Sequence, residues 1–256
     1  MRNISLLPCL SIFEWPVEPR IRRISCLCLA ISLVSNLVFS AESINQQTEE
    51  DKAGGWKLLF DGKTMHGWHN FKTNTVTRGW VVGDGWLHCL GKEGGGDIIS
   101  DGTFDNFDLQ WEWKQVPGGN SGLKYFVSEK REAPLGHEYQ MIDDEQNGDA
   151  KLAQGKRVTG SFYDVLKPER IDLTKSPGEI NRSRVIVQGN HVEHWLNGAK
   201  VLDYSCGSEA LKTALHQSKF SNTRGFGDKI VGHILLQDHH SEVWFRNIKI
   251  RELPAQ

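Results

Sequence analysis

The sequence predicts an all-β protein, built as an antiparallel jelly-roll β-sandwich. From Gly54 onward, short runs of alternating apolar and polar residues are interrupted by Gly, Asn or Asp at intervals of about eight to twelve residues. These runs give roughly a dozen strands, and no helical segment is long enough to serve as the crossover between parallel strands. Strands that follow one another without crossover helices are expected to pair antiparallel.

The strands follow from the alternation pattern and from the turn residues between them. Gly83-Asp84-Gly85 and Asn197-Gly198 accept positive φ angles and therefore predict hairpin turns. In Ser208–Lys219, apolar residues recur at helical spacing, which predicts one or two turns of helix over a sheet edge. The expected strands are Trp56–Phe60, Trp80–Val82, Trp86–His88, Leu109–Val116, Leu123–Ser128, His137–Asp144, Arg184–Gln188, His191–Leu196, Ala199–Asp203, Ile234–Gln237 and Glu242–Arg251.

The first 40 residues have the pattern of a secretory signal peptide. Arg20, Arg22 and Arg23 precede an apolar run, Ile24–Phe39, which is short for a membrane span and contains several polar residues. Residues 41–53 are polar and aperiodic, so we expect a flexible linker there. Residues 54–256 then form one domain, and the mature protein is expected to be periplasmic or extracellular, with no stable membrane span after processing.

The charge balance excludes some partners. The whole chain carries a net charge of −2, and removing the leader with its four basic and two acidic residues makes this about −4. Because no basic run is present to follow phosphates, a nucleic-acid partner is not expected. Three of the five cysteines lie in the leader; in an exported protein the remaining Cys89 and Cys206 could be paired or free.

The stretch His137–Asp144 carries the strongest chemical signal. On alternation, Glu138 and Gln140 share one strand face, which must be wet because burying an unpaired carboxylate is costly. A β-bulge near Ile142 would bring Asp143 onto the same face. Two carboxylates with an amide between them suit acid/base chemistry on a sugar, although an ordinary solvated sheet face has the same composition.

Five motifs resemble the 3-keto-disaccharide hydrolase domain family, formerly a domain of unknown function. They are LLFDGKTMHGWHNF at Leu58, GGNSGLKYF at Gly118, HEYQMIDD at His137, TGSFYDVLKP at Thr159 and GHILLQDHHSEVWFRNIKI at Gly232. The resemblance covers about Gly54 to Leu253 and implies a concanavalin A-like (lectin/glucanase) jelly roll. It also implies an enzyme that acts on a small carbohydrate.

Glucanases of this fold carry an E-x-D-x-x-E strand, and the same offsets read Glu138-x-Gln140-x-x-Asp143 in this sequence. The helper carboxylate is replaced by an amide and the last acid is one methylene shorter. A retaining mechanism needs its carboxyl groups about 5–5.5 Å apart, so the comparison predicts the location of the site and not its chemistry.

Other side chains are candidates for the same site. Lys124 can stabilise an oxyanion, and Asn120 and His239 can bind sugar hydroxyls. Tyr163 can stack on a sugar ring, as can Trp80 or Trp86. Each of these residues also has an ordinary alternative role, as a solvated lysine or as a core aromatic.

A metal cofactor is not expected. His191 and His194 point to opposite strand faces and cannot share a zinc ion. Asp143-x-Glu145-x-Asn147-Gly148 resembles the start of a calcium loop, but Gln154 stands where the bidentate Glu is required, so a structural Ca²⁺ is the weaker alternative to a polar turn.

The sequence therefore predicts an exported enzyme that cleaves the glycosidic bond of 3-keto-glycosides. Glu138, Asp143 and Lys124 are the expected catalytic residues, and Gln140, Asn120, Tyr163 and His239 the expected substrate-binding residues. Elimination after proton abstraction at C2 and direct hydrolysis both remain open. A non-catalytic carbohydrate-binding module is the alternative, because the fold alone does not decide function.

Overall fold

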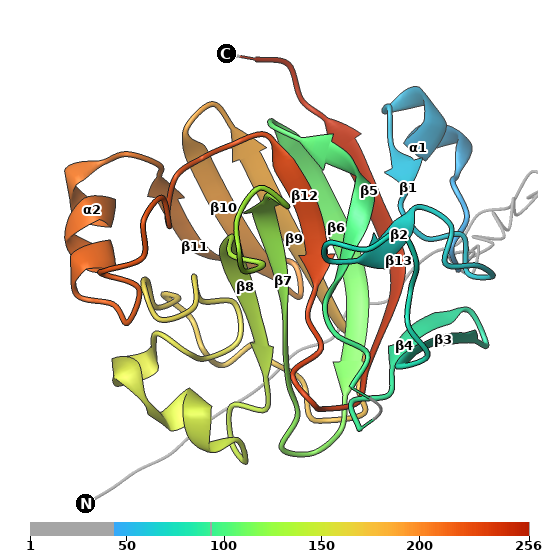
Figure 1. The fold of residues 1–256 in the computed structure, drawn as a ribbon, viewed down its shortest axis with the longest axis horizontal. Coiled ribbons are helices and arrows are strands. Elements are labelled where there is room, and N and C mark those ends of the chain that lie inside the picture. The colour runs from blue at the N-terminus through green and yellow to red at the C-terminus, as the bar shows by residue number, and fades with distance from the viewer. Residues whose placement is uncertain (1–43, 93, 256) are drawn as a thin grey trace, which may run out of the picture. The chain divides into compact units, whose positions relative to one another are not determined.

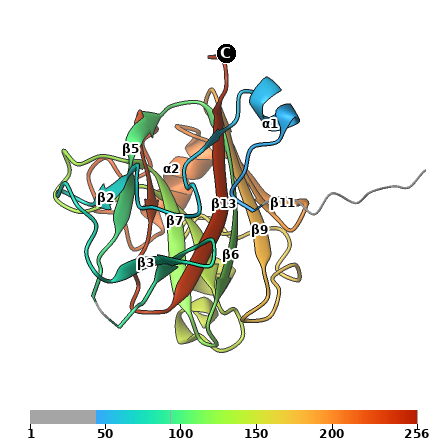
Figure 2. The ribbon, with the colours of Figure 1, turned by 90° about the vertical axis from the view of Figure 1, so that its right-hand side faces the viewer.

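The computed structural model describes residues 44–92 and 94–255. Two antiparallel sheets stack face to face, with the helix α2 at one edge (Figures 1 and 2). The predicted antiparallel β-sandwich is therefore confirmed. The expected signal peptide, residues 1–40, lies outside the described residues. Among the residues that are described, no helix combines the length and the apolar character needed to cross a membrane.

The larger sheet has eight strands, in the order β11-β10-β9-β6-β13-β4-β3, with β1 paired to β13. Sequential hairpins form its two ends, and β13 lies between β6 and β4. Its strands are β1 Lys57–Leu58, β3 Trp80–Gly83, β4 Trp86–Cys89, β6 Phe107–Gln115, β9 Asn181–Gln188, β10 His191–Leu196, β11 Ala199–Ser205 and β13 Val243–Glu252.

The smaller sheet has five strands, in the order β2-β5-β12-β7-β8. They are β2 Trp68–Asn70, β5 Ile98–Phe104, β7 Asn120–Val127, β8 His137–Ile142 and β12 Gly232–Leu236. Short helical segments complete the chain: α1 Glu49–Ala53, η1 Gly148–Lys151, η2 Ala153–Gly155 and α2 Glu209–His216. The α2 helix begins at the N-cap Ser208, whose side chain accepts from the backbone N–H of Leu211, within the predicted range.

Two strands were not predicted, β2 and β5. In β5, Ser100, Asp101 and Gly102 interrupt the apolar pattern, which hides the strand from a search for alternation. Pairing with β12 on one side and β2 on the other holds this segment extended. Tertiary pairing therefore overrides the weak local signal.

The linker expected at residues 41–53 is wrong for the described part, residues 44–53. Thr48 and Asp51 form a capping box that starts α1. The side chain of Asp51 also accepts from Lys249 Nζ at 2.6 Å, and Asn45 Nδ2 donates to the carbonyl of Gly85 at 2.7 Å. These polar contacts attach the segment to the domain, and a search for apolar periodicity does not detect contacts of this kind.

The core lies between the sheets and is rich in aromatic rings. Trp111 of β6 meets Tyr139 of β8 edge to face, with ring centroids 5.0 Å apart. Phe107 of β6 meets Tyr125 of β7 in the same way at 6.0 Å. Because Tyr125 and Tyr139 point into the sandwich, the residues that alternate with them on β7 and β8 must point out of it.

A chain of buried polar groups joins the two sheets beneath β7 and β8. His194 donates through Nδ1 to the Gly160 carbonyl, so its Nε2 accepts from the Tyr125 hydroxyl at 2.8 Å. Tyr204 contacts the Tyr125 hydroxyl at 2.6 Å and His137 Nδ1 at 2.8 Å. Burial lowers the pKa of His137 to about 3 and that of His194 to about 4, so both rings are neutral. The network fixes the inner face of the strands that carry the candidate site.

Candidate active site

A polar pocket of about 170 Å³ lies on the outer face of the five-stranded sheet. The strands β7 and β8 form its floor, and the segments around Tyr163 and after α2 form its walls. Six of the seven predicted site residues line it, namely Asn120, Lys124, Glu138, Gln140, Tyr163 and His239. The other lining residues are Leu135, Gly136, Lys219, Phe220, Phe226 and Gln237.

The register of β7 and β8 brings the floor residues together. Lys124 is the direct partner of Glu138, and Gly122 is the partner of Gln140. A Cβ atom on Gly122 would lie 2.7 Å from Glu138 Oε1, which is far inside normal contact. The absence of a side chain at Gly122 therefore allows the Glu138 carboxylate to lie flat against the sheet.

The ammonium group of Lys124 lies between two carboxylates. Its Nζ is 3.8 Å from Glu138 Oε2 and 3.8 Å from Asp97 Oδ2. Burial raises the pKa of Glu138, the charge of Lys124 opposes this, and the charge of Asp97 adds to the rise. Burial likewise raises the pKa of Asp97 against the effect of Lys124. A carboxylate in this setting is a stronger base than an exposed one, which suits proton abstraction.

Two buried acceptors in the pocket have no hydrogen-bond donor. They are Asn120 Oδ1 and Gln237 Oε1. A buried polar atom without a partner is costly, and native structures rarely leave one unexplained. The hydroxyl groups of a sugar would satisfy both atoms, which supports the substrate-binding role predicted for Asn120 and adds Gln237 to it.

The Asp97 carboxylate is held in place by the loop that follows β12. Asp238 donates its backbone N–H to Asp97 Oδ1 at 2.9 Å, and Asp238 Oδ2 accepts from the N–H of Gly96. His239 follows on the same loop and lies exposed at the rim of the pocket. This loop therefore positions one carboxylate and one imidazole over the sheet.

The aromatic wall comes from segments distant in sequence from the floor. Phe220 and Phe226 stack with ring centroids 4.0 Å apart. Tyr163 lies beside them, and its hydroxyl donates to Asp149 Oδ2 at 2.9 Å. Burial raises the pKa of Tyr163 and the Asp149 carboxylate adds to the rise, so the phenol is neutral. Apolar ring faces next to fixed polar atoms are typical of a carbohydrate-binding surface.

Asp143 does not take the place predicted for it. The β7–β8 ladder has no register shift, so the bulge expected near Ile142 is absent from it. Asp143 Oδ1 accepts from the N–H groups of Glu145 and Gln146, and its Oδ2 accepts from that of Gly118. Burial opposes ionisation, but these three bonds outweigh it and lower the pKa. The side chain caps a turn, and Asp97 supplies the second carboxylate beside Lys124.

The predicted stacking tryptophans lie elsewhere. Trp80 is a core residue that donates through Nε1 to the Gly96 carbonyl at 2.8 Å. Trp86 is covered by the cations of Lys114 and Arg246. Neither lines the pocket, so that expectation is wrong. Cys89 and Cys206 are both buried free thiols.

The calcium-like turn uses its oxygens internally. Besides the contacts of Asp143, Asn147 Oδ1 accepts from the N–H of Asp149 and starts η1. Arg157 binds Asp149 at 2.5 Å. The oxygens of Asp143 and Asn147 therefore cap backbone N–H groups, and Asp149 is the ion-pair partner of Arg157, as in a polar turn.

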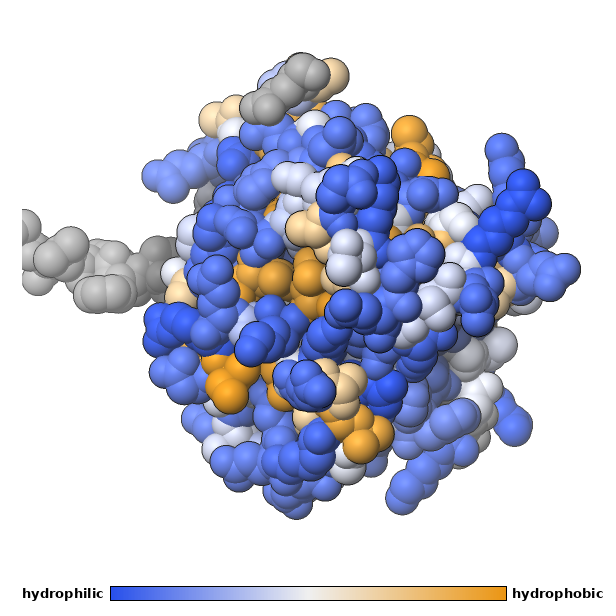
Figure 3. Space-filling view, turned by 90° about the vertical axis from the view of Figure 1, so that its left-hand side faces the viewer, coloured by the Kyte–Doolittle hydropathy of each residue, from blue (hydrophilic) through white to orange (hydrophobic). Residues whose placement is uncertain are grey.

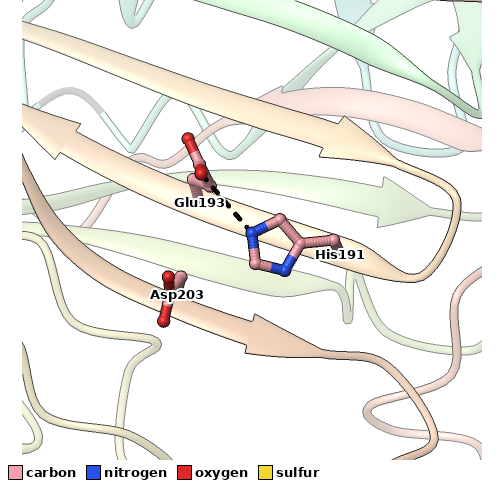
Figure 4. Close-up of side chains that lie close together, drawn as sticks. All are labelled: His191, Glu193 and Asp203. Carbon is pink, nitrogen blue, oxygen red and sulfur yellow. Dashed lines mark hydrogen bonds and ion pairs between the residues drawn. The ribbon is translucent and has the colours of Figure 1, made fainter.

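Elsewhere in the described chain, one group brings three ligand atoms within 4.8 Å of one another. It consists of His191 and Glu193 of β10 with Asp203 of β11, on the larger sheet (Figure 4). Lys200 Nζ lies 2.5 Å from Asp203 Oδ2 and 3.5 Å from Glu193 Oε1. Because Lys200 already pairs with both acids, we interpret the group as an ion-pair cluster at the surface.

A second, larger pocket of about 370 Å³ lies on the outer face of the eight-stranded sheet. Its charged groups are held in ion pairs. Within the lining, Arg182 binds Glu112 and Lys249 binds Asp51, while Arg184 binds Asp108 outside it. Volume alone does not identify an active site. The smaller pocket is lined by Glu138, whose pKa is raised, and by the two unsatisfied acceptors, so we assign the candidate site there.

The side of the molecule that carries α2 is largely hydrophilic (Figure 3). Hydrophobic areas on it are small and separated by polar side chains. A surface of this kind is better suited to a polar small ligand than to a broad macromolecular interface.

Comparisons with known proteins agree with this site and fold. Residues 55–251 match the family described as 3-keto-alpha-glucoside-1,2-lyase-like domain. A relative from Bacteroides thetaiotaomicron named 3-keto-disaccharide hydrolase is 34% identical over 232 residues, which cover 78% of this chain and 79% of the relative. The chain belongs to the 3-keto-alpha-glucoside-1,2-lyase-like family.

Solved structures support the same assignment. A candidate glycosyl hydrolase from Parabacteroides distasonis is 36% identical and superposes with a TM-score of 0.75, covering 83% of this chain and 100% of that one. A second one from the same organism is 27% identical, with a TM-score of 0.62 over 77% of this chain and 99% of its own. The predicted family and the predicted glycoside hydrolase-like enzyme are therefore confirmed.

The lyase-like domain contains both walls of the pocket. Its match begins after α1 and ends within β13, so every lining residue from Asn120 to His239 lies inside it. Sequence reasoning missed two polar residues that line the pocket, Lys219 and Gln237, and the carboxylate of Asp97 beside Lys124. Gln237 and Asp238 were visible in the LLQDHH motif, whereas nothing local distinguishes Asp97 or Lys219 from surface charges.

Proposed function

We propose that this protein cleaves the glycosidic bond of 3-keto-glycosides, starting with removal of the C2 proton. The observation that carries the proposal is the buried Glu138 carboxylate with Lys124 Nζ 3.8 Å away, on the floor of a small pocket. Pockets for drug-sized ligands usually hold about 300–1,000 Å³, so this one suits a single sugar ring.

The chemistry follows from the ketone. A carbonyl at C3 acidifies the C2 hydrogen, and the Glu138 carboxylate removes it as a general base. The electron pair moves onto the C3 oxygen, where the Lys124 ammonium stabilises the negative charge of the enolate. The enolate then expels the glycosidic oxygen from C1, which leaves a C1–C2 double bond, and water adds to this enone to complete a net hydrolysis.

The relative from Bacteroides thetaiotaomicron, by its name, hydrolyses 3-keto-disaccharides, and this supports a keto sugar as the substrate class here. Direct hydrolysis is the alternative, and it requires a second carboxylate set across the scissile bond. Asp143 was the expected partner, but its oxygens cap backbone N–H groups, and Asp97 lies beside Lys124 without lining the pocket. Elimination needs one base and one cation at the enolate oxygen, and the pocket holds both.

The test compares a 3-keto-glucoside with its unoxidised parent, using the purified protein in heavy water. Aglycone release from the keto sugar alone, with deuterium at C2 of recovered or released sugar, is the expected result. Release from the parent glucoside without exchange at C2 would favour the oxocarbenium route. Binding of both sugars without any release would indicate a carbohydrate-binding module.

We also propose that the protein is exported, because Arg20, Arg22 and Arg23 precede the apolar run Ile24–Phe39. Mass spectrometry of the protein from its native cells should then show a mature chain that begins near Ala41. An intact Met1 would contradict export by cleavage.

A further inference from the structure

The pocket contains a second ammonium group, that of Lys219, which the mechanism above does not use. Lys219 lies three residues beyond the end of α2, on the wall formed with Tyr163 and Phe220. Its Nζ is 4.2 Å from the centroid of the Tyr163 ring and 5.1 Å from that of Phe220. Glu138 and Lys219 influence each other electrostatically, so both charges act on the same cavity.

A chain of directed hydrogen bonds orients this ammonium. Lys219 Nζ lies 2.9 Å from the Tyr163 hydroxyl oxygen, and that hydroxyl donates its one proton to Asp149 Oδ2 at 2.9 Å. The Tyr163 oxygen must therefore accept from Lys219. Arg157 Nη1 holds the other oxygen of Asp149 at 2.5 Å. One ammonium proton is used by Tyr163, which leaves two for a ligand.

The backbone of Lys219 is fixed by the same cluster. Its N–H donates to Asp164 Oδ2 at 2.6 Å, and Arg157 Nε binds Asp164 Oδ1 at 2.6 Å. Asp164 is buried and paired with Arg157. A lysine on a loop would normally sample many rotamers, but here both ends of the side chain are held.

Partial burial, more than the neighbouring charges, favours proton release from Lys219. Partial burial lowers the pKa of its ammonium, and the Arg157 cation lowers it further. The carboxylates of Glu138, Asp164 and Asp149 oppose this shift without cancelling it. An ammonium whose pKa is lowered is a stronger proton donor than a freely solvated one.

We propose that Lys219 is the general acid that protonates the departing glycosidic oxygen, with Tyr163 and Asp149 as its positioning residues. The inference rests on the proposed elimination. As the C1–O bond breaks, its electron pair passes to the glycosidic oxygen, and that oxygen takes a proton from the Lys219 ammonium, which becomes an amine. The C2 proton resides on Glu138, and exchange of both groups with water restores the starting state.

The test uses leaving groups of different acidity. Protonation matters for an alkoxide leaving group and hardly at all for 4-nitrophenolate. Lys219→Met should therefore lose about 10²-fold or more in rate on a methyl 3-keto-glucoside, but remain within a few-fold of wild type on the 4-nitrophenyl compound, after correction for spontaneous elimination. Tyr163→Phe should show the same leaving-group dependence with a smaller loss.

Lys212→Met is the matched control, because Lys212 is an exposed α2 lysine paired with Glu209. It should behave as wild type on both compounds. An equal loss for Lys219→Met on both leaving groups, or no loss on either, overturns the role of Lys219 while the proposed function stands. Wild-type protein that releases neither aglycone overturns the proposed function and this inference together.

Discussion

Lys124 and Glu138 are direct cross-strand partners on β7 and β8, with Lys124 Nζ 3.8 Å from Glu138 Oε2. On an exposed sheet such a pair would contribute little. Here Glu138 is 8% exposed, and a second carboxylate, Asp97, lies equally far from the same ammonium. Burial and the negative charge of Asp97 raise the pKa of Glu138 against the effect of Lys124, and this makes the pair a candidate for proton transfer.

Glu138→Gln removes the proposed base with almost no change in shape. The rate of aglycone release from a 3-keto-glucoside should fall by at least about 10²-fold, the usual scale for a positioned proton-transfer group. Glu145→Gln changes an exposed glutamate a few residues away and should leave the rate unchanged. Equal rates for Glu138→Gln and wild type would exclude Glu138 as the base.

The same variant, Glu138→Gln, also tests how the buried carboxylate affects the stability of the fold. Because burial raises the pKa of Glu138, the folded state favours the protonated form, and the associated stability is lost as the pH rises through the raised value. Gln mimics the protonated acid at every pH. Thermal unfolding at pH 7 should therefore show no loss of stability for Glu138→Gln, and a large drop would mean that lost activity reflects unfolding.

Gly122→Ala tests whether the flat position of the carboxylate matters. The new Cβ would lie 2.7 Å from Glu138 Oε1 and must displace it. Displacement of about 1 Å can cost on the order of 10²-fold in rate, so a loss of this order is expected in kcat/KM. Gly148→Ala, where nothing lies within 4 Å of the new atom, is the control. Wild-type kcat/KM for Gly122→Ala would show that the carboxylate tolerates a new position.

The pH profile should report the electrostatic coupling of Asp97 to Glu138. The base must be ionised, so kcat/KM should fall as the pH drops through the raised pKa of Glu138, above the ordinary 4.5. Asp97→Asn removes a negative charge that contributes to this rise, and its acid limb should lie at lower pH. Asp101→Asn, on exposed Asp101 of β5, should not move it. If the acid limb of the kcat/KM profile lies at the same pH for Asp97→Asn and wild type, the electrostatic coupling of Asp97 to Glu138 is contradicted.

Chelation should leave the activity unchanged. In the proposed mechanism, Lys124 and Lys219 supply the positive charge at the two oxygens where negative charge develops. The single group of three clustered ligand atoms in the described chain lies on the larger sheet. Dialysis against a chelator followed by assay on the keto substrate checks this. Activity lost on dialysis and restored by a divalent cation would show that a metal ion supplies that charge.

The sequence by itself determined the sandwich and the floor of the site. Alternation in β7 and β8 places Lys124, Glu138 and Gln140 on one face, because neighbouring residues of a strand point to opposite sides. Ser208 and the spacing after it determined α2 in the same local way. These features depend on contacts between residues close in the chain, so their periodicity is visible in the printed sequence.

Only the tertiary structure decided which charges meet at Glu138. Asp97 precedes β5 and Lys219 follows α2. Strand order and hydrogen bonds to distant residues bring Asp97 beside Lys124 and bring Lys219 into the pocket. Asp143, by contrast, is close in sequence yet is drawn away by three backbone N–H groups. The free energy of a buried carboxylate depends on which donors and charges surround it in space, and spacing along the chain does not specify these.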